Sequence, residues 1–325
     1  MSWLVTGAAG YIGAHVVRAF RAADIDVVAL DNLSSGIRSF VPEDVPFEHV
    51  DVLDTEGVHR VIVDHHVTGV VHLAAFKYAG ESVRRPLHTW RQNLGGTLSL
   101  LDATDATAVS AFVFSSTAAV YGTPATEVVT ESTPTAPASP YGESKLAAER
   151  LIADVASAAR AHSQPFAWTA LRYFNVVGSG TPDVWDASPH NLFPLVLGAI
   201  ARGEAPRING DDFPTPDGTC VRDYIHVADL ARAHVEAARR LADGQALEPI
   251  YNLGSGQGTS VREIVDACLR VTGSPLTARV QGRRPGDPAR IVAAGDLARR
   301  DLGWQMTHSI DDMVASAWAA HPRDP

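Results

Sequence analysis

The sequence has few cysteines, few lysines and no long hydrophobic run. Its two cysteines, Cys220 and Cys268, are too few for a disulfide scaffold and lack metal-ligand spacing, so we expect a reducing cytoplasm and no metal site. No apolar stretch approaches the ~18 residues of a membrane span, and the opening MSWLVTGAAG lacks the basic region of a secretory signal. The 27 basic and 37 acidic residues give a net charge of −10, which disfavours a broad nucleic-acid surface.

Apolar runs alternate with helical patterns through the first half of the 325 residues. The expected strands are Trp3–Thr6, Val27–Asp31, Phe47–Val50, Val70–Ala74, Phe112–Ser115 and Thr169–Arg172. The expected helices are Gly10–Ala23, Thr55–His65, Thr89–Ala103 and Ser144–Ala161. This alternation predicts an α/β fold with a doubly wound parallel sheet of the Rossmann type. We expect a dinucleotide-binding domain at 1–172, with returning segments near 222–254, and a smaller mixed α/β substrate domain at 173–325.

Three glycines mark a candidate dinucleotide site at the end of the first strand. Gly7, Gly10 and Gly13 have the spacing Gly-x-x-Gly-x-x-Gly, and a helix follows at once, so its N-terminal N–H groups can bind a pyrophosphate. Asp31 ends the second strand, where a carboxylate accepts the ribose hydroxyls of NAD and repels the extra phosphate of NADP. Arg38 is the one residue that argues for NADP, and we interpret it as a solvated loop side chain. The predicted cofactor is NAD.

Tyr141 and Lys145 form a candidate catalytic pair. They lie four residues apart at the start of a helical pattern, so they share a helix face. A phenol has a pKa of ~10, and a neighbouring ammonium and the positive nicotinamide ring would both lower it. Of the 27 basic residues only Lys77 and Lys145 are lysine, which makes a chance Tyr-x-x-x-Lys a poor explanation. Both lysines fall where a parallel sheet places its ligand crevice.

A hydroxyl group completes the candidate centre. Ser115, Ser116 and Thr117 follow the fifth strand, and each could hydrogen-bond a substrate oxygen held near Tyr141. Spacing alone does not decide which of the three hydroxyl groups binds the substrate.

The chain resembles the extended short-chain dehydrogenase/reductase family and within it looks most like the UDP-glucose 4-epimerases. The resemblance runs nearly end to end, and its most specific segment is PTPDGTCVRDYIHV at 214–227. The other segments that carry it are 5–13, 80–83, 114–122, 141–145 and 171–175. It implies epimerisation of a nucleotide sugar at carbon 4 with tightly bound NAD, and a homodimer.

The same resemblance implies roles for individual residues. Tyr141 would be the catalytic base, Lys145 its electrostatic partner, and Thr117 the hydroxyl that binds the sugar. Together with the glycine motif it predicts a cofactor site of Gly7, Gly10, Tyr11, Ile12, Gly13, Asp31, Asn32, Leu33, Ser34, Ser35, Gly36, Asp51, Val52, Leu73, Ala74, Ala75, Lys77, Asn93, Tyr141, Lys145 and Phe174. The predicted substrate site is Thr117, Tyr141, Asn175, Asn191, Leu192, Asn209, Arg222, Arg284, Asp287 and Ile291.

Two positions depart from the family pattern. Asn209 stands where relatives often place an aromatic side chain against the uracil, and Pro285 replaces a common acidic residue. Ile291 falls at a position that gates the sugar pocket in this family. Its intermediate volume predicts slow turnover of N-acetyl sugars, and Val292 is the alternative gate.

Related reactions on nucleotide sugars, such as dehydration, need additional acid or base groups near the sugar ring. Dehydratases typically carry Asp-Glu directly after the threonine, whereas Ala118 and Ala119 follow Thr117 here. We therefore expect a 4-epimerase of UDP-glucose and UDP-galactose. The alternatives are 4-epimerisation of another nucleotide sugar, such as UDP-N-acetylglucosamine, and a non-catalytic NAD-binding sensor.

Overall fold

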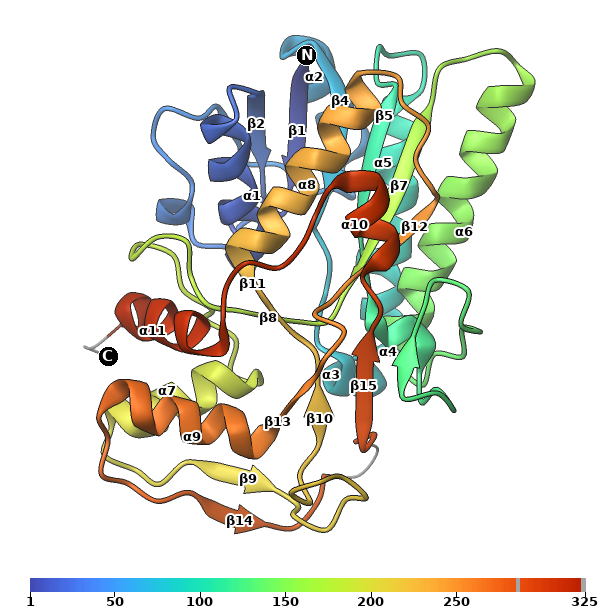
Figure 1. The fold of residues 1–325 in the computed structure, drawn as a ribbon. Coiled ribbons are helices and arrows are strands. Elements are labelled where there is room, and N and C mark those ends of the chain that lie inside the picture. The colour runs from blue at the N-terminus through green and yellow to red at the C-terminus, as the bar shows by residue number, and fades with distance from the viewer. Residues whose placement is uncertain (285–286, 323–325) are drawn as a thin grey trace.

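A computed structural model describes residues 1–284 and 287–322, so Pro285 lies outside the described residues. Its centre is a seven-stranded parallel sheet with the strand order β12-β7-β5-β4-β1-β2-β3 (Figure 1). The strands are β1 (Ser2–Thr6), β2 (Asp26–Leu30), β3 (Phe47–Glu48), β4 (Val67–His72), β5 (Ala111–Thr117), β7 (Ala167–Tyr173) and β12 (Ile250–Leu253).

Helices cover both faces of this sheet, which confirms the predicted doubly wound α/β fold. One face packs against α1 (Tyr11–Ala22), α8 (Val227–Ala242) and α10 (Asp296–Leu302). The other packs against α2 (Thr55–Asp64), α5 (Gly96–Thr104) and α6 (Pro140–Ala161). Because apolar side chains from both layers meet the strands, the strands are buried on both faces and read as continuous apolar runs.

The strand order reverses beside β1, which lies between β2 and β4. Chain connections leave in opposite directions at such a point, so a crevice opens at the carboxyl ends of these strands. The loops after β1, β2, β4 and β5 all reach this edge.

Residues after β7 build most of the second region (Figure 1). Its strands are β6 (Val128–Val129), β8 (Asn175–Val177), β9 (Arg207–Asn209), β10 (Val221–Arg222), β11 (Tyr224–His226), β13 (Thr259–Ser260), β14 (Arg279–Gln281) and β15 (Arg290–Ala293). The helices α7 (Leu192–Ala201), α9 (Val261–Thr272) and α11 (Ile310–Ala320) share a separate apolar core. The chain returns to the first region through α8 and β12, while β10 and β11 stay in the second.

Two helical expectations need correction. The helix that carries the catalytic pair begins at Pro140 and not at Ser144, because the Ser139 side chain caps it by accepting from the Gly142 N–H and proline suits the first turn. The expected helix at 89–103 is three consecutive pieces, namely α4 (Pro86–Trp90), the π-helical turn η2 (Arg91–Gly95) and α5. Sequence reasoning also missed α3 (Ala79–Arg84) and two 3-10 turns, η1 (Arg38–Phe40) and η3 (Ala118–Tyr121).

Within the described residues, no helix is both long enough and apolar enough to cross a membrane.

Candidate active site

A cavity of about 1870 Å³ lies between the carboxyl edge of the large sheet and the second region. Ligand pockets commonly measure roughly 300–1,000 Å³, so this one has room for two ligands side by side. Its lining comes from the loops after β1, β2, β4 and β5, from the first turn of α6, and from β8, β9, β14 and β15.

The glycine loop shapes one end of the cavity. Gly7 has a positive φ of 69°, and a Cβ there would lie 2.7 Å from the Ala74 nitrogen. A Cβ on Gly13 would lie 2.1 Å from the Gly7 oxygen. Gly10 is the N-cap residue of α1. Since glycine has no side chain, no side-chain group bonds to the first-turn N–H groups of α1. This backbone cradle fits the pyrophosphate of a dinucleotide.

A carboxylate pair lies beside the cradle. Asp31 is buried at the end of β2 and accepts hydrogen bonds from the N–H groups of Ala9, at 3.0 Å, and Leu33, at 2.8 Å. Burial raises the pKa of Asp31, and these two hydrogen bonds oppose that rise. Asp51 accepts from the Asn32 amide at 2.8 Å. Arg38 lies over the Phe47 ring, 4.4 Å from its centroid, and donates to the Val41 carbonyl. The arrangement suits the ribose hydroxyls of NAD.

Most of the predicted cofactor residues line this cavity. They are Gly7, Gly10, Tyr11, Ile12, Gly13, Asp31, Asn32, Ser34, Ser35, Gly36, Asp51, Val52, Leu73, Ala74, Ala75, Lys77, Tyr141, Lys145 and Phe174. Leu33 and Asn93 are not among the lining residues. Leu33 has a positive φ of 56° and packs against the core below the sheet edge.

Asn93 lies behind the cavity wall and hydrogen-bonds to residues of the loop after β4 and of α6. Its side chain accepts from the Phe76 N–H at 2.7 Å and donates to the Phe76 carbonyl at 3.1 Å and to the Ser144 hydroxyl at 2.9 Å. It therefore fixes the loop after β4 against α6.

Tyr141 and Thr117 meet at the centre of the cavity. Both residues line it, and the Thr117 side chain lies close enough to the Tyr141 phenol to affect its pKa. Burial raises the pKa of the Tyr141 phenol, and the Thr117 side chain partly offsets that rise. The lowering of the Tyr141 pKa expected from the sequence is therefore outweighed by burial, and the positive nicotinamide ring of bound NAD would favour the phenolate further.

Lys145 is buried beside this pair. Its Nζ donates to the Ser115 carbonyl at 2.8 Å and lies 4.7 Å from the centroid of the Phe114 ring. Burial lowers the pKa of Lys145 to about 7, and the Glu149 carboxylate opposes the lowering.

The three candidate hydroxyls separate in the structure. Ser116 donates to Glu149 below the cavity, and Ser115 is hydrogen-bonded to the Tyr173 phenol. Ser115 and Thr117 both line the cavity, but the Ser115 hydroxyl is occupied by Tyr173, whereas the Thr117 side chain lies near Tyr141. Of the three, Thr117 is the one placed to meet a substrate oxygen.

Cationic and polar groups gather at the end of the cavity away from the glycine loop. Arg222 and Arg284 both approach Asp287, with N–O distances of 3.8 Å and 3.0 Å. Asn209 is hydrogen-bonded to Gln281, its partner across the β9–β14 pair. The predicted substrate residues Asn175, Asn191, Leu192, Asn209, Arg222, Arg284, Asp287 and Ile291 all line the cavity. Ile291 reaches it from β15, whereas Val292 is fully buried and is not among the lining residues.

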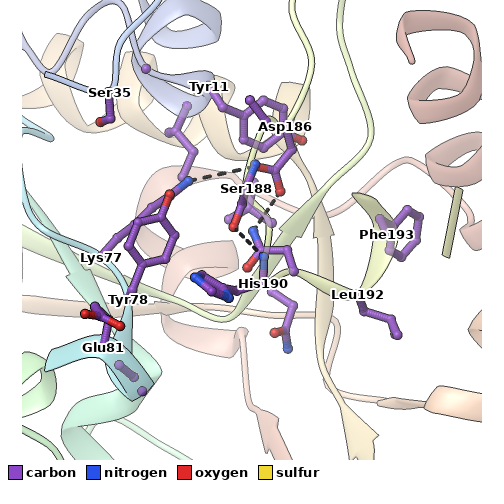
Figure 2. Close-up of a pocket in the computed structure, with 18 of the residues that line it drawn as sticks. Tyr11, Ser35, Lys77, Tyr78, Glu81, Asp186, Ser188, His190, Leu192 and Phe193 are labelled. Atoms are coloured by element: carbon purple, nitrogen blue, oxygen red, sulfur yellow. Dashed lines mark hydrogen bonds and ion pairs between the residues drawn. The ribbon is translucent and has the colours of Figure 1, made fainter. Parts of the chain in front are cut away.

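Sequence reasoning missed a polar group in the segment between β8 and α7, close to Tyr11 of α1. Figure 2 shows Asp186 facing Lys77, and their charged atoms are 3.9 Å apart. The Asp186 carboxylate also accepts from the Asn191 amide at 2.7 Å and from the Ser188 N–H at 3.0 Å. These residues lie in an aperiodic Gly/Pro-rich loop, so the only available signal was the short polar spacing from Asp186 to Asn191.

The fold and the site define the class: a Rossmann-type protein with a dinucleotide cradle and a Tyr-x-x-x-Lys pair, as in the short-chain dehydrogenases/reductases. Residues 3–254 match the model of the NAD dependent epimerase/dehydratase family, and the chain belongs to that family.

Several similar proteins match nearly the whole chain. It is 45% identical to a UDP-glucose 4-epimerase of Streptomyces lividans over 99% of this chain and 97% of the relative. A UDP-glucose 4-epimerase structure from Brucella ovis in complex with NAD is 38% identical, with a TM-score of 0.90 over 98% of this chain and 97% of that one. One from Bifidobacterium longum, in complex with NAD⁺ and UDP, is 36% identical, with a TM-score of 0.88 over 98% of both chains.

Proposed function

We propose that this member of the family interconverts UDP-glucose and UDP-galactose, with NAD retained between turnovers. The observation that carries the proposal is that Thr117, Tyr141 and Lys145 line one cavity, which is large enough for a dinucleotide and a nucleotide sugar together. The full-length similarity to UDP-glucose 4-epimerases supports the choice of substrate.

The residues that hold NAD are those of the glycine loop, Asp31 with its neighbours, and the wall formed after β4. When bound, NAD supplies a reversible acceptor for the hydride on carbon 4 of the sugar. The chain itself supplies position and charge.

Tyr141 and Thr117 act on the sugar hydroxyl at carbon 4. Thr117 hydrogen-bonds the oxygen and orients it, and Tyr141 removes its proton as carbon 4 is oxidised to a ketone. When carbon 4 is reduced again, Tyr141 returns the proton to the oxygen. The positive charge of Lys145 stabilises the phenolate form of Tyr141 throughout.

Inversion at carbon 4 requires the ketone to present its other face. Arg222 and Arg284 can hold the diphosphate by bidentate hydrogen bonds while the sugar turns in the cavity. Ala118 and Ala119 follow Thr117 along the lining. Their methyl groups have no acid or base function, so this stretch of the wall offers nothing for the elimination of water.

The test is a product assay with purified protein and no added NAD. We expect UDP-galactose to be converted to UDP-glucose and the reverse, with Tyr141→Phe as the inactive control. A panel of other nucleotide sugars extends the assay. Faster turnover of a different nucleotide sugar, or no turnover of either UDP-hexose, would overturn the assignment.

We further infer a homodimer in the cytoplasm. Val83 on α3, Leu87 on α4 and Leu98 on α5 are exposed, Leu87 by 79%, and α3 and α4 pack on α6. A second copy of the chain would cover this apolar surface. Two buried free thiols, Cys220 and Cys268, support a reducing compartment. Sedimentation should give a dimer that Leu87→Asp weakens, and a monomeric wild type would contradict the assembly.

A further inference from the structure

A buried polar network lies directly below the catalytic pair. Glu149 follows Lys145 by four residues on α6, so the two side chains share one helix face. Glu149 is 4% exposed and Lys145 is 3% exposed. A carboxylate this deeply buried carries a large desolvation cost, so its place beside a catalytic lysine calls for a physical reason.

The Glu149 carboxylate is fixed from two strands. Arg172 on β7 donates to it through both Nε, at 2.9 Å, and a terminal nitrogen, at 2.5 Å. Ser116 on β5 donates its hydroxyl to the same carboxylate. Arg172 in turn donates to the Tyr121 phenol at 3.0 Å. With its oxygens held by a guanidinium and a hydroxyl, the carboxylate is fixed in position on this face of α6.

The direct contacts of Lys145 leave its charge without an anionic partner. Its Nζ has the Ser115 carbonyl and the Phe114 ring as neighbours, and neither carries a full negative charge. Burial favours the neutral amine and Glu149 favours the ammonium. A neutral amine could not stabilise the Tyr141 phenolate.

We propose that Glu149 is a positioning residue of the catalytic centre, whose carboxylate, held by Arg172 and Ser116, keeps Lys145 protonated on the helix face that carries Tyr141. The proposal rests on the proposed function only for the catalytic use of Lys145. The protonation of Lys145 can be measured whatever the substrate is.

Other titratable and charged groups lie on α6 itself and on β4, β7 and η3. His72 on β4 is fully buried, and burial followed by the charge of Lys145 lowers its pKa to about 3, so it is neutral. The remaining groups are Tyr141 and Glu149 on α6, Arg172 and Tyr173 on β7, and Tyr121 in η3. Among these, Glu149 is the group whose charge raises the pKa of Lys145.

The scarcity of lysine makes a direct measurement possible. Lys77 and Lys145 are the only lysines, so lysine labelled with carbon-13 at Cε gives two side-chain signals apart from the N-terminus. Lys77 is half-exposed and serves as the internal reference. We would titrate both signals in the NAD-loaded protein of the wild type and of Glu149→Gln, and assign them with Lys77→Arg.

Removing the charge of Glu149 should lower the titration midpoint of Lys145 by about 1 to 3 pH units, the usual effect of one nearby opposite charge. The alkaline limb of the kcat–pH profile should move to lower pH by the same amount. At a pH above this limb, kcat of the variant should therefore fall about tenfold for each pH unit of the shift. KM should change little. A role in stability alone would lower the melting temperature and leave the midpoint in place.

Two further variants complete the test. Glu143→Gln removes an exposed carboxylate from the same helix and should leave the midpoint unchanged. Glu149→Asp keeps the charge but withdraws it by one methylene, so it should give a smaller downward shift, and it decides the question if Glu149→Gln does not fold. An unchanged Lys145 midpoint in the folded Glu149 variants overturns the proposal. Loss of UDP-sugar activity in the wild type would overturn only the proposed function.

Discussion

Asn93 and Ser144 are hydrogen-bonded, with 2.9 Å between the Asn93 Nδ2 and the Ser144 Oγ, and this contact joins the π-helical turn η2 to the helix that carries Tyr141 and Lys145. Ser144 in turn donates to the Tyr141 carbonyl at 2.8 Å. The wall after β4 and the catalytic helix are therefore held in one position by a pair of neutral side chains.

Removing this link should weaken both stability and catalysis. Asn93→Ala leaves the partly buried Phe76 N–H without its partner, at a cost of about 1–3 kcal/mol. We expect a lower melting temperature together with a lower kcat, because α6 loses its support. Thermal unfolding and initial rates measure the two. Arg91→Ala, an exposed change in the same turn, is the control, and equal effects from both variants would contradict the role given to Asn93.

Tyr141→Phe removes the phenol without changing the shape of the side chain. We expect kcat to fall on the order of 10²–10⁴, the usual contribution of a positioned acid–base group, while NAD stays bound. Tyr251→Phe removes a phenol outside the cavity, where it contacts Glu248 and Asp301, and should leave kcat near the wild-type value. Near-normal turnover in Tyr141→Phe would mean that another group moves the proton.

Lys145→Arg keeps the charge and should still be damaging. The wider guanidinium cannot occupy the point between the Ser115 carbonyl and the Phe114 ring that the ammonium fills. We expect kcat to fall at least about tenfold with the fold intact. Arg150→Lys, the reverse exchange at an exposed position of the same helix, provides the comparison. Equal rates for Lys145→Arg and the wild type would show that only the charge matters.

The sheet and the catalytic helix could be predicted from the sequence because their signals are local. Continuous apolar runs and helical periodicity indicate β1, β2, β4, β5 and β7 with the helices between them. The strand-to-helix glycines and the four-residue spacing of Tyr141 and Lys145 are also local patterns.

The remaining features depend on contacts between distant segments. Asp186 lies in a loop without periodicity and meets Lys77 only after folding. Asn93 was predicted to line the cofactor site, yet its side chain bonds to Phe76 and Ser144 behind the wall. The pKa of Tyr141 was predicted to fall next to Lys145, but burial raises it, and burial is not readable from a spacing of four residues.

The glycine cradle predicts that the protein retains its cofactor through purification. Redox balance closes within one turnover, so we expect roughly one NAD per chain to be released on denaturation. Gly13→Ala should abolish retention, because the added Cβ would lie 2.1 Å from the Gly7 oxygen. Gly282→Ala, where a Cβ meets no atom within 4 Å, is the matched control. Absence of dinucleotide from the denatured wild type, with no gain in activity on adding NAD, would contradict retention.

Ile291 is expected to set the tolerance of the site for a substituent at carbon 2 of the sugar. It lies on β15, is 8% exposed, and lines the cavity next to Arg222, its partner on β10. A β-branched side chain is stiff at χ1 and cannot fold away from an acetamido group. UDP-N-acetylglucosamine should therefore react more slowly than UDP-glucose by about 10–200-fold in kcat/KM, which corresponds to ~1–3 kcal/mol.

Shortening the Ile291 side chain should reduce the difference in kcat/KM between UDP-glucose and UDP-N-acetylglucosamine. Ile291→Ala and Ile291→Gly should raise kcat/KM for UDP-N-acetylglucosamine while changing that for UDP-glucose little, because the space gained is next to the substituent. Val292→Ala is the comparison, since Val292 is fully buried and not among the residues that line the cavity, and it should lower stability without altering the substrate ratio. The test measures kcat/KM for both substrates in the wild type, Ile291→Ala, Ile291→Gly and Val292→Ala. If Ile291→Gly leaves the ratio of the two kcat/KM values unchanged, the gate lies at another residue.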